Sequence, residues 1–275
     1  MARPCSWTAA ETRWEGAERN MKPTFLHQNR PLITCMVQAP SVDETILLIR
    51  NAAYDGADAW GFQMENLPPK EQTEANLRRI FSNTDGKPIY ATNYRSNRNT
   101  GRSDDDLAES WKLLIRSGAT LVDIMGDVFC PTPGELTEDP AAVEKQMALI
   151  DEIHAMGGEV LMSSHVCRFI PAEDVLRIAK AHEARGADIC KIVTAANSEE
   201  EEMENLRIIT LLKQELNIPF LFLCGGSHCK RHRQLGPLFG CCMWLTVGSY
   251  DRSATPMQPL TRAMRTLADT LSYDL

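Results

Sequence analysis

The sequence predicts a single-domain (β/α)8 TIM barrel, and three observations support this fold class. Eight short apolar runs alternate with longer amphipathic segments over about 250 residues, which is the size and rhythm of such a barrel. None of the runs alternates cleanly between apolar and polar residues, as expected of parallel strands covered on both faces. The chain has 275 residues, 43% hydrophobic and 24% charged, which is ample for one large buried core.

The eight apolar runs have the length of β-strands. They are PLITCMV (31–37), ADAWGFQM (57–64), KPIYATNY (87–94), ATLVDIM (119–125), EVLMSSH (159–165), DICKIV (188–193), PFLFLC (219–224) and CMWLTV (242–247). A doubly wound open sheet is the alternative arrangement of such runs. It is disfavoured because no G-x-G-x-x-G follows a run where that fold would need one.

Helix boundaries between the runs are marked by capping residues. Residues 41–56 and 103–118 each open with a serine and an acidic first turn, and residues 171–186 open with a proline. All three segments end at a glycine that leads into the next strand through Gly-Ala-Asp or Gly-Ala-Thr. These segments are therefore predicted to be helices that end at or just before their glycines.

Composition and net charge limit the kinds of binding partner and the cellular compartment that we expect for this protein. The net charge of -8 argues against nucleic acid, whose binding depends on clustered Lys and Arg. No apolar run reaches the roughly 18 residues of a membrane span. Residues 1–20 lack an apolar signal segment and are expected to form a poorly ordered extension, with the barrel over residues 21–275. Nine cysteines, several in strand-like runs, are typical of free thiols in a reducing compartment, so we expect a cytoplasmic protein.

One segment, residues 224–242, is rich in cysteine and histidine. Zinc ligands are usually closely spaced pairs such as C-x2-C, and this segment contains no such pair. The spacing therefore does not predict a metal site.

Polar residues stand near the C-terminal ends of the runs, where barrel active sites lie. Lys191 interrupts an apolar run; it either reaches solvent from the strand end or faces inward, toward His165 on the neighbouring strand. A lysine in an apolar, cation-rich pocket would be held more readily as the neutral amine that attacks a carbonyl. Taken singly, His165 could be a satisfied strand-end histidine and Arg95 a solvated loop charge.

Four segments resemble the type I 3-dehydroquinate dehydratase family, and the resemblance covers residues 30–270. Its S-x-H, D-x-x-K, R-x-x-G-x-x-F-G and P-G-Q motifs are similar to Ser163-Ser164-His165, Asp188-Ile189-Cys190-Lys191, residues 233–240 and Pro256-Met257-Gln258. The resemblance implies a barrel enzyme in which Lys191 forms an imine and His165 is the general acid and base. It further implies that Arg233 holds a substrate carboxylate, that Gln258 contacts the substrate, and that no metal or cofactor takes part.

The chain departs from this family around the same pocket. The family has E-x-R-x-D at the end of the second strand, where this sequence has Gly61, Gln63 and Glu65. After the third strand the family has an arginine followed by Glu-Gly-Gly, whereas Arg95 is followed by Asn99 and then Thr-Gly. A serine of the family is replaced by His232. His165 is therefore expected to lack a carboxylate partner.

We accordingly predict a Schiff-base dehydratase, a lyase acting on a carboxylate-bearing cyclic hydroxy-ketone such as 3-dehydroquinate or a relative, in a homodimer. Arg95, Gln63, Ser163 and Asn99 are the further candidate substrate-binding residues. A class I aldolase-type lyase would use the same lysine to break a C–C bond, and a noncatalytic barrel would keep only the pocket. The Gly-Gly-Ser turn at 225–227 could instead bind phosphate, as the loop after the seventh strand often does in barrels.

Overall fold

The computed structural model of the chain describes residues 22–251 and 254–271, and it confirms the predicted barrel. All strand pairs are parallel. The strands are β1 Leu32–Val37, β2 Ala59–Gln63, β3 Ile89–Thr92, β4 Leu121–Met125, β5 Glu159–His165, β6 Ile189–Ala195, β7 Phe220–Gly225 and β8 Met243–Thr246. The extension expected at residues 1–20 lies outside the described residues.

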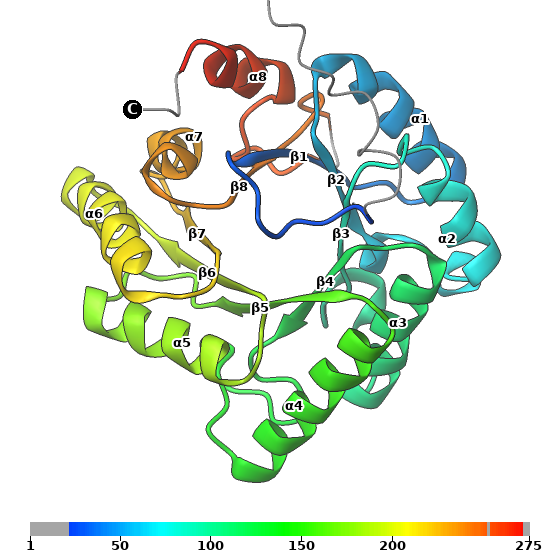
Figure 1. Cartoon of the computed structure of the whole chain (residues 1–275), viewed down its shortest axis with the longest axis horizontal. Helices are drawn as coiled ribbons and strands as arrows, with labels where there is room; N and C mark the ends of the chain where they lie inside the picture. Colours follow the sequence, from blue (N-terminus) through cyan, green and yellow to red (C-terminus); the bar gives the residue numbers. More distant parts are fainter. Residues whose placement is uncertain (1–21, 252–253, 272–275) are drawn as a thin grey trace, which may run out of the picture.

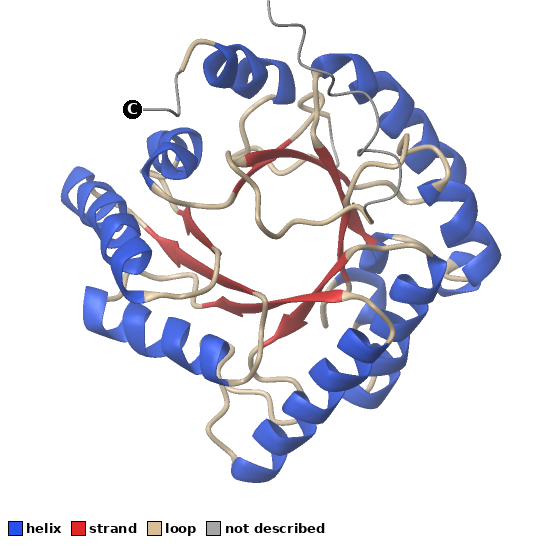
Figure 2. Cartoon of the chain, in the orientation of Figure 1, coloured by secondary structure: helices blue, strands red, loops and turns tan. Residues whose placement is uncertain are grey.

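The strands form one sheet in the order β7-β6-β5-β4-β3-β2-β1-β8, so β1 pairs with both β2 and β8. At the seam, the backbone N–H of Cys242 donates to the carbonyl of Phe220 at 2.8 Å. The helices form a ring outside the strands (Figures 1 and 2). They are α1 Val42–Ala52, α2 Glu74–Phe81, α3 Asp104–Ser117, α4 Pro140–Ala155, α5 Ala172–Ala184, α6 Glu199–Glu215, α7 Lys230–Phe239 and α8 Thr261–Asp269.

Side-chain caps fix the starts of several helices. Each capping oxygen accepts a hydrogen bond from the backbone N–H three residues further on, a donor that the helix itself leaves unpaired. The residues that do so are Ser41, Thr73, Ser103, Asp139 and Ser198.

The predicted glycine stops are present, with one difference. Gly118 after α3 and Gly186 after α5 have φ values of +115° and +92°, a left-handed conformation that favours glycine. By contrast, α1 ends earlier, at Ala52, and a short 3-10 turn over Ala53–Asp55 carries the chain to Gly56.

Alternate residues of each strand point into the barrel. The register places Ser163 of β5 beside Lys191 of β6, both on the inward face. Lys191 is only 4% exposed, so it does not reach solvent from a strand end. Apolar side chains fill the interior around this level; they include Leu32, Leu121, Leu161, Ile189, Leu221 and Met243.

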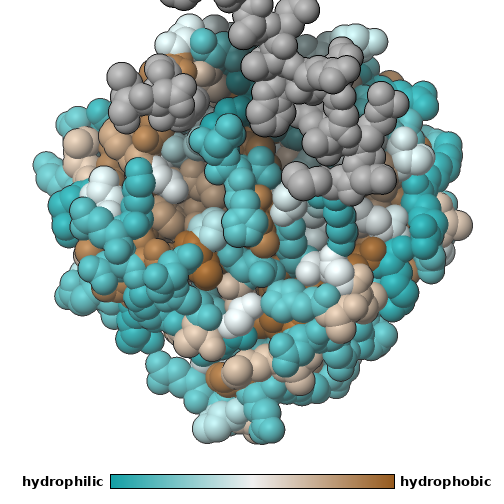
Figure 3. Space-filling model, viewed as in Figure 1, coloured by the Kyte–Doolittle hydropathy of each residue, from teal (hydrophilic) through white to brown (hydrophobic). Residues whose placement is uncertain are grey.

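The N-terminal end of the barrel is closed by the segment that precedes β1. Phe25 packs into the interior cluster, and its backbone N–H donates to Glu159 at the start of β5. This segment crosses the barrel in dark blue in Figure 1, and the same face is mainly hydrophilic at its rim (Figure 3). A ligand can therefore approach the inward polar groups from the opposite, C-terminal end.

None of the described helices is both long and apolar enough to span a membrane. The eight cysteines in the described residues all have free thiols. Most of them are buried, and burial raises the pKa of thiols such as Cys35 to about 11.

Trp111 provides a test of how α3 packs on the sheet. The side chain is fully buried, and its indole N–H has no hydrogen-bond partner within residues 22–251 and 254–271. Replacing Trp111 by Ala should lower the free energy of unfolding by about 3–5 kcal/mol, because it leaves a large cavity. Trp111→Phe should cost clearly less, since the ring is kept and no hydrogen bond is lost. Urea unfolding of both variants measures this, and equal losses would contradict it.

Candidate active site

The ammonium of Lys191 is surrounded by three hydrogen-bond acceptors inside the barrel. Its Nζ donates to Asp123 Oδ2 at 2.9 Å, to the Tyr90 hydroxyl at 3.0 Å and to the Tyr94 hydroxyl at 2.6 Å. An ammonium has three N–H donors, so these partners satisfy all of them. The expectation of a cation-rich pocket is wrong, because the charged group in contact with Lys191 is a carboxylate.

Asp123 is held as an anion by its surroundings. Both tyrosine hydroxyls accept from Lys191 and donate to Asp123 Oδ2. Burial alone would raise the pKa of the Asp123 carboxyl, but Lys191, His165 and Ser163 together lower it below its ordinary value of 3.8. Burial and the nearby Asp123 charge raise the pKa of both tyrosines well above 10, so the phenols keep their protons.

His165 has a carboxylate partner, contrary to expectation. Its Nδ1 lies 2.6 Å from Glu135 Oε2, and its backbone N–H donates to the same oxygen at 3.0 Å. The ring also meets the ring of Tyr94 edge to face, with 5.0 Å between centroids. Glu135 belongs to the loop between β4 and α4, not to the loop after β3 where the family places its glutamate.

Ser163 lies between the two candidate catalytic groups. It is fully buried, and the register sets it beside Lys191 and two residues before His165 on the same face of β5. Ser163 Oγ and Asp123 Oδ1 both lack a hydrogen bond of good geometry among the described residues, although Ser163 is close enough to lower the pKa of Asp123. Both oxygens are thus free to bond to a ligand.

Arg233 and Gln258 are both buried, at 8% and 5% exposure. Arg233 Nε donates to the carbonyl of Cys224 at 2.7 Å, and no carboxylate in the described part of the chain pairs with its guanidinium. Burial lowers the pKa of Arg233. Gln258 Oε1 has no hydrogen-bond partner among the residues that the structure describes. A buried cation without a counterion is suited to a carboxylate ligand, because the ligand would supply the missing charge.

Two of the predicted substrate-binding residues, Arg95 and Asn99, already bond to other groups of the protein. Arg95 binds Asp104 through Nε and Nη2, at 2.7 and 2.8 Å, and Asp127 through Nη1 at 2.6 Å. The buried Asn99 amide donates to Asn93 Oδ1 and to a backbone carbonyl, and it accepts from an arginine. These contacts tie the loop after β3 to its surroundings and leave neither side chain free to grip a substrate.

Gln63 lies at the C-terminal end of β2, where its Oε1 accepts from Asn66 at 3.2 Å. With Gln38, Arg98 and Thr255 it lines a cavity of ≈ 740 Å³. Two residues earlier, Gly61 faces Met36, and a Cβ placed at position 61 would come within 2.0 Å of the Met36 sulfur. Met36 therefore fills the space that a side chain at position 61 would need.

Glu65 is buried in the middle of the short 3-10 turn Met64–Asn66 that follows β2. Both of its carboxylate oxygens accept from Thr92 Oγ1, at 2.9 and 3.0 Å. Burial, with a smaller contribution from Asp123, raises its pKa from 4.5 to about 7. Glu65 thus carries a proton in the folded protein under conditions where an exposed glutamate would not.

Gly226 in the loop after β7 and His232 in the first turn of α7 are both explained by packing. Gly226 has φ +86°, and a Cβ there would lie 2.4 Å from the carbonyl oxygen of Ala196, so only glycine fits this turn. His232 is fully buried against Phe222, and burial lowers its pKa to about 3. Gly226 and His232 thus contribute to the packing of this part of the barrel.

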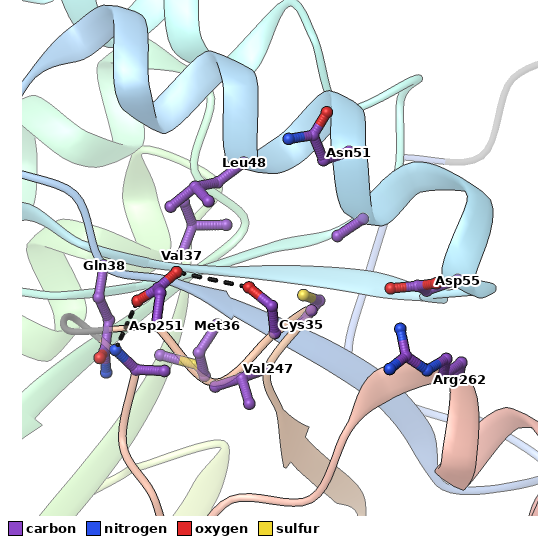
Figure 4. A pocket seen from close by; sticks show the side chains of 14 residues that line it. Cys35, Met36, Val37, Gln38, Leu48, Asn51, Asp55, Val247, Asp251 and Arg262 are labelled. Carbon is purple, nitrogen blue, oxygen red and sulfur yellow. Dashed lines mark hydrogen bonds between the residues drawn. The ribbon is translucent and has the colours of Figure 1, made fainter.

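A second cavity, of ≈ 280 Å³, lies between β1, α1 and the segment after β8 (Figure 4). Cys35, Asn51, Asp55 and Arg262 are among the residues that line it. Among the described side chains, no group of three or more His, Cys, Asp or Glu residues is arranged to hold a metal ion.

Four residues that contact Lys191 or His165 were not among those predicted from the sequence: Tyr90, Tyr94, Asp123 and Glu135. Asp123 gave the same signal as Lys191, a charge inside an apolar run, and the two could have been paired on that ground. The tyrosines alternate along the third run, as inward-facing residues do. Nothing local marks Glu135, because its position depends on the course of a long loop.

The sequence is similar to known proteins over most of its length. The sequence model of the type I 3-dehydroquinase family matches residues 33–274. The chain is 26% identical to the 3-dehydroquinate dehydratase of Klebsiella pneumoniae strain 342 over 259 residues, which is 92% of this chain and 98% of that protein.

Solved structures show the same fold. The 3-dehydroquinate dehydratase of Geobacillus kaustophilus HTA426 superimposes with a TM-score of 0.73 at 20% identity, covering 88% of this chain and 93% of that one. The type I enzyme of Clostridium difficile, solved with covalently modified comenic acid, also gives 0.73, at 15% identity with 88% and 92% covered.

The raised pKa of Glu65 predicts how stability depends on pH. Unfolded chains ionise this group near pH 4.5, whereas the folded protein keeps the proton to about pH 7, so unfolding releases a proton between those values. Stability should therefore fall by about 3 kcal/mol as pH rises through this window, relative to a Glu65→Gln variant that does not titrate. Urea unfolding of both proteins across the window tests this. Parallel stability curves would contradict the prediction.

Proposed function

The chain belongs to the type I 3-dehydroquinase family and is a dehydratase, a carbon–oxygen lyase; from this premise we propose that it works through a Schiff base on Lys191. The observation that carries the proposal is the position of Lys191, inside the barrel on the strand next to His165 and among groups that balance its charge. A solvent-exposed lysine would not be held in one geometry for attack.

The first step joins Lys191 to a ketone. Nζ attacks as the amine, and the proton that the ammonium gives up ends on the hydroxyl that leaves the adduct as water, so that an iminium remains. The positive charge then stays on the same nitrogen, 2.9 Å from Asp123 Oδ2 in the resting state. A carboxylate already in place stabilises that charge without reorganisation of its surroundings.

His165 carries the proton transfers in this proposal. The iminium makes the neighbouring C–H acidic, and His165 takes that proton as the electron pair forms an enamine. The enamine expels the β-hydroxyl, and the imidazolium returns its proton so that water leaves. Hydrolysis of the remaining iminium releases the unsaturated ketone and the lysine. The electron sink is the iminium itself, so the cycle requires no metal or diffusible cofactor.

Arg233 and Gln258 would orient the substrate. The guanidinium of Arg233 lacks a carboxylate partner among the described residues, and Gln258 has a free amide oxygen in a buried position. A substrate carboxylate on Arg233 and a hydroxyl on Gln258 would satisfy both groups. This supports a carboxylate-bearing cyclic hydroxy-ketone as the substrate class.

Within that class we propose a substrate other than 3-dehydroquinate, one with fewer hydroxyl groups or a larger ring substituent. Met36 presents sulfur where the family has a carboxylate on the second strand, and Gln63 stands in place of an arginine. Arg95 and Asn99 are committed to their own loops. Gln63 and Arg98 line the cavity at this end of the barrel and are the groups available for new contacts.

An ordinary 3-dehydroquinate dehydratase is the competing assignment, and an aldolase-type lyase or a noncatalytic binder are more distant ones. Product analysis separates dehydration from C–C cleavage, and turnover separates both from binding alone. A cytoplasmic homodimer belongs to the same proposal, and the free thiols support the reducing compartment.

Steady-state kinetics test the substrate assignment. We expect kcat/KM for 3-dehydroquinate to lie below about 10⁴ M⁻¹s⁻¹, the lower end of the common range, because hydroxyl-binding groups are missing. The Klebsiella pneumoniae relative, assayed in parallel, controls for the quality of the substrate. A less hydroxylated cyclic keto acid should be turned over faster. A kcat/KM for 3-dehydroquinate inside the common range would refute the divergence.

A further inference from the structure

The loop between β4 and α4, residues 126–139, supplies the carboxylate that contacts His165. We propose that Glu135 is a positioning residue for His165, holding its ring so that Nε2 is the basic nitrogen, and that a buried arginine fixes the loop for this purpose. The proposal deepens the proposed function, since it concerns the group that moves the protons there.

The contact between Glu135 and His165 determines which ring nitrogen is free. A carboxylate oxygen can only accept, so Nδ1–H is the donor across the 2.6 Å separation. The proton on Nδ1 leaves Nε2 unprotonated and available as the base. The same oxygen accepts from the backbone N–H of His165 at 3.0 Å, so the carboxylate is fixed relative to the main chain of β5 as well as to the ring.

The backbone of Glu135 is held on its other side. Its carbonyl accepts from Ser164 Oγ at 2.6 Å, and Ser164 lies beside the buried His182 at 3.0 Å. Glu135 has φ +54°, a left-handed conformation that is uncommon for a residue with a side chain. Such a conformation persists where the surrounding contacts hold it in place. Backbone conformations of this kind cluster at functional sites in proteins.

Gly126 makes this close approach possible. A Cβ at position 126 would lie 2.7 Å from the carbonyl oxygen of Glu135 and 3.1 Å from Ser164 Oγ. The first of these is a backbone atom that could not move without shifting Glu135. The start of the loop is therefore packed directly against the residue that carries the carboxylate.

A buried arginine ties the two ends of the loop together. Arg185, at the end of α5, donates to the carbonyls of Gly126 at 2.8 Å and Thr137 at 2.5 Å, and to Gln146 Oε1 at 2.9 Å. No carboxylate in the described part of the chain pairs with it, and burial lowers its pKa. Its three acceptors are uncharged, so its contribution is to fix the geometry of the loop on both sides of Glu135.

The choice of Glu135 is specific within its loop. Glu138 is three residues further on and exposed, and it forms an ion pair with Arg177 on the surface of α5 at 3.1 Å. The two glutamates thus share a loop and a charge but differ in their contact with His165. Glu138→Gln is a matched control that removes one negative charge and leaves the His165 contact in place.

The experiment compares Glu135→Ala, Glu135→Gln, His165→Ala and Glu138→Gln with the unaltered full chain. Proton NMR of ¹⁵N-histidine-labelled protein should show a hydrogen-bonded Nδ1–H that is absent from His165→Ala and therefore belongs to His165. This signal should be lost in Glu135→Ala and kept in Glu138→Gln. An unchanged signal in Glu135→Ala would overturn the proposal, and this readout does not depend on any substrate.

Kinetics supply the second readout, with 3-dehydroquinate as the probe. Glu135→Ala should lower kcat on the order of 10²-fold with KM changed by less than about threefold, and Glu135→Gln should fall between it and the unaltered enzyme, since its amide oxygen still accepts from Nδ1–H. Deuterium in place of the substrate hydrogen that is abstracted should lower kcat by a larger factor in Glu135→Ala than in the unaltered enzyme. Equal kcat in Glu135→Ala and Glu138→Gln would refute the inference. Absence of any borohydride-trapped adduct on the unaltered enzyme would instead refute the proposed function, and the NMR result would still decide the role of Glu135.

Discussion

The buried ion pair between Lys191 and Asp123 is the constraint on which the rest of the site depends. An ammonium at 5% exposure is tolerable because a carboxylate and two phenols use all three of its donors. Removing one partner of such a pair typically costs about 3–5 kcal/mol, since the other charge is left uncompensated. The same carboxylate lies where an iminium would carry its charge. The same arrangement of side chains therefore stabilises the resting barrel and would stabilise the intermediate.

Strands and loops supply different residues of the site around this pair. The register sets Ser163 beside Lys191, while Asp123 of β4 lies opposite Leu161, two residues before Ser163 on β5. The Lys191 side chain reaches Asp123 at 2.9 Å inside the barrel. The loop between β4 and α4 supplies Glu135, which contacts His165. The loop between β4 and α4 is clamped by Arg185. Because Phe25 closes the opposite end, the polar groups face a single mouth.

The fold could be predicted from the sequence, because strand length, capping serines and helix-ending glycines are local signals. The structure contains all three features. The sequence also brought Lys191, His165 and Ser163 to one face, since alternation along neighbouring strands decides which side a residue takes. It could not place Arg95 or Asn99, because Arg95 pairs with Asp127 of the following loop and Asn99 bonds to Asn93 within its own loop. The expected lack of a carboxylate on His165 was wrong for the same reason: a long loop returns to the strand, and no pattern in the sequence reports that path.

The covalent role of Lys191 is the central claim, and borohydride trapping tests it most directly. The full chain is incubated with 3-dehydroquinate or with less hydroxylated cyclic keto acids, reduced, digested and mapped by mass spectrometry. The account predicts a single adduct on the peptide that contains Lys191, and no adduct in a Lys191→Met variant that remains folded. An adduct on another lysine, or none with any of these keto acids, would contradict it.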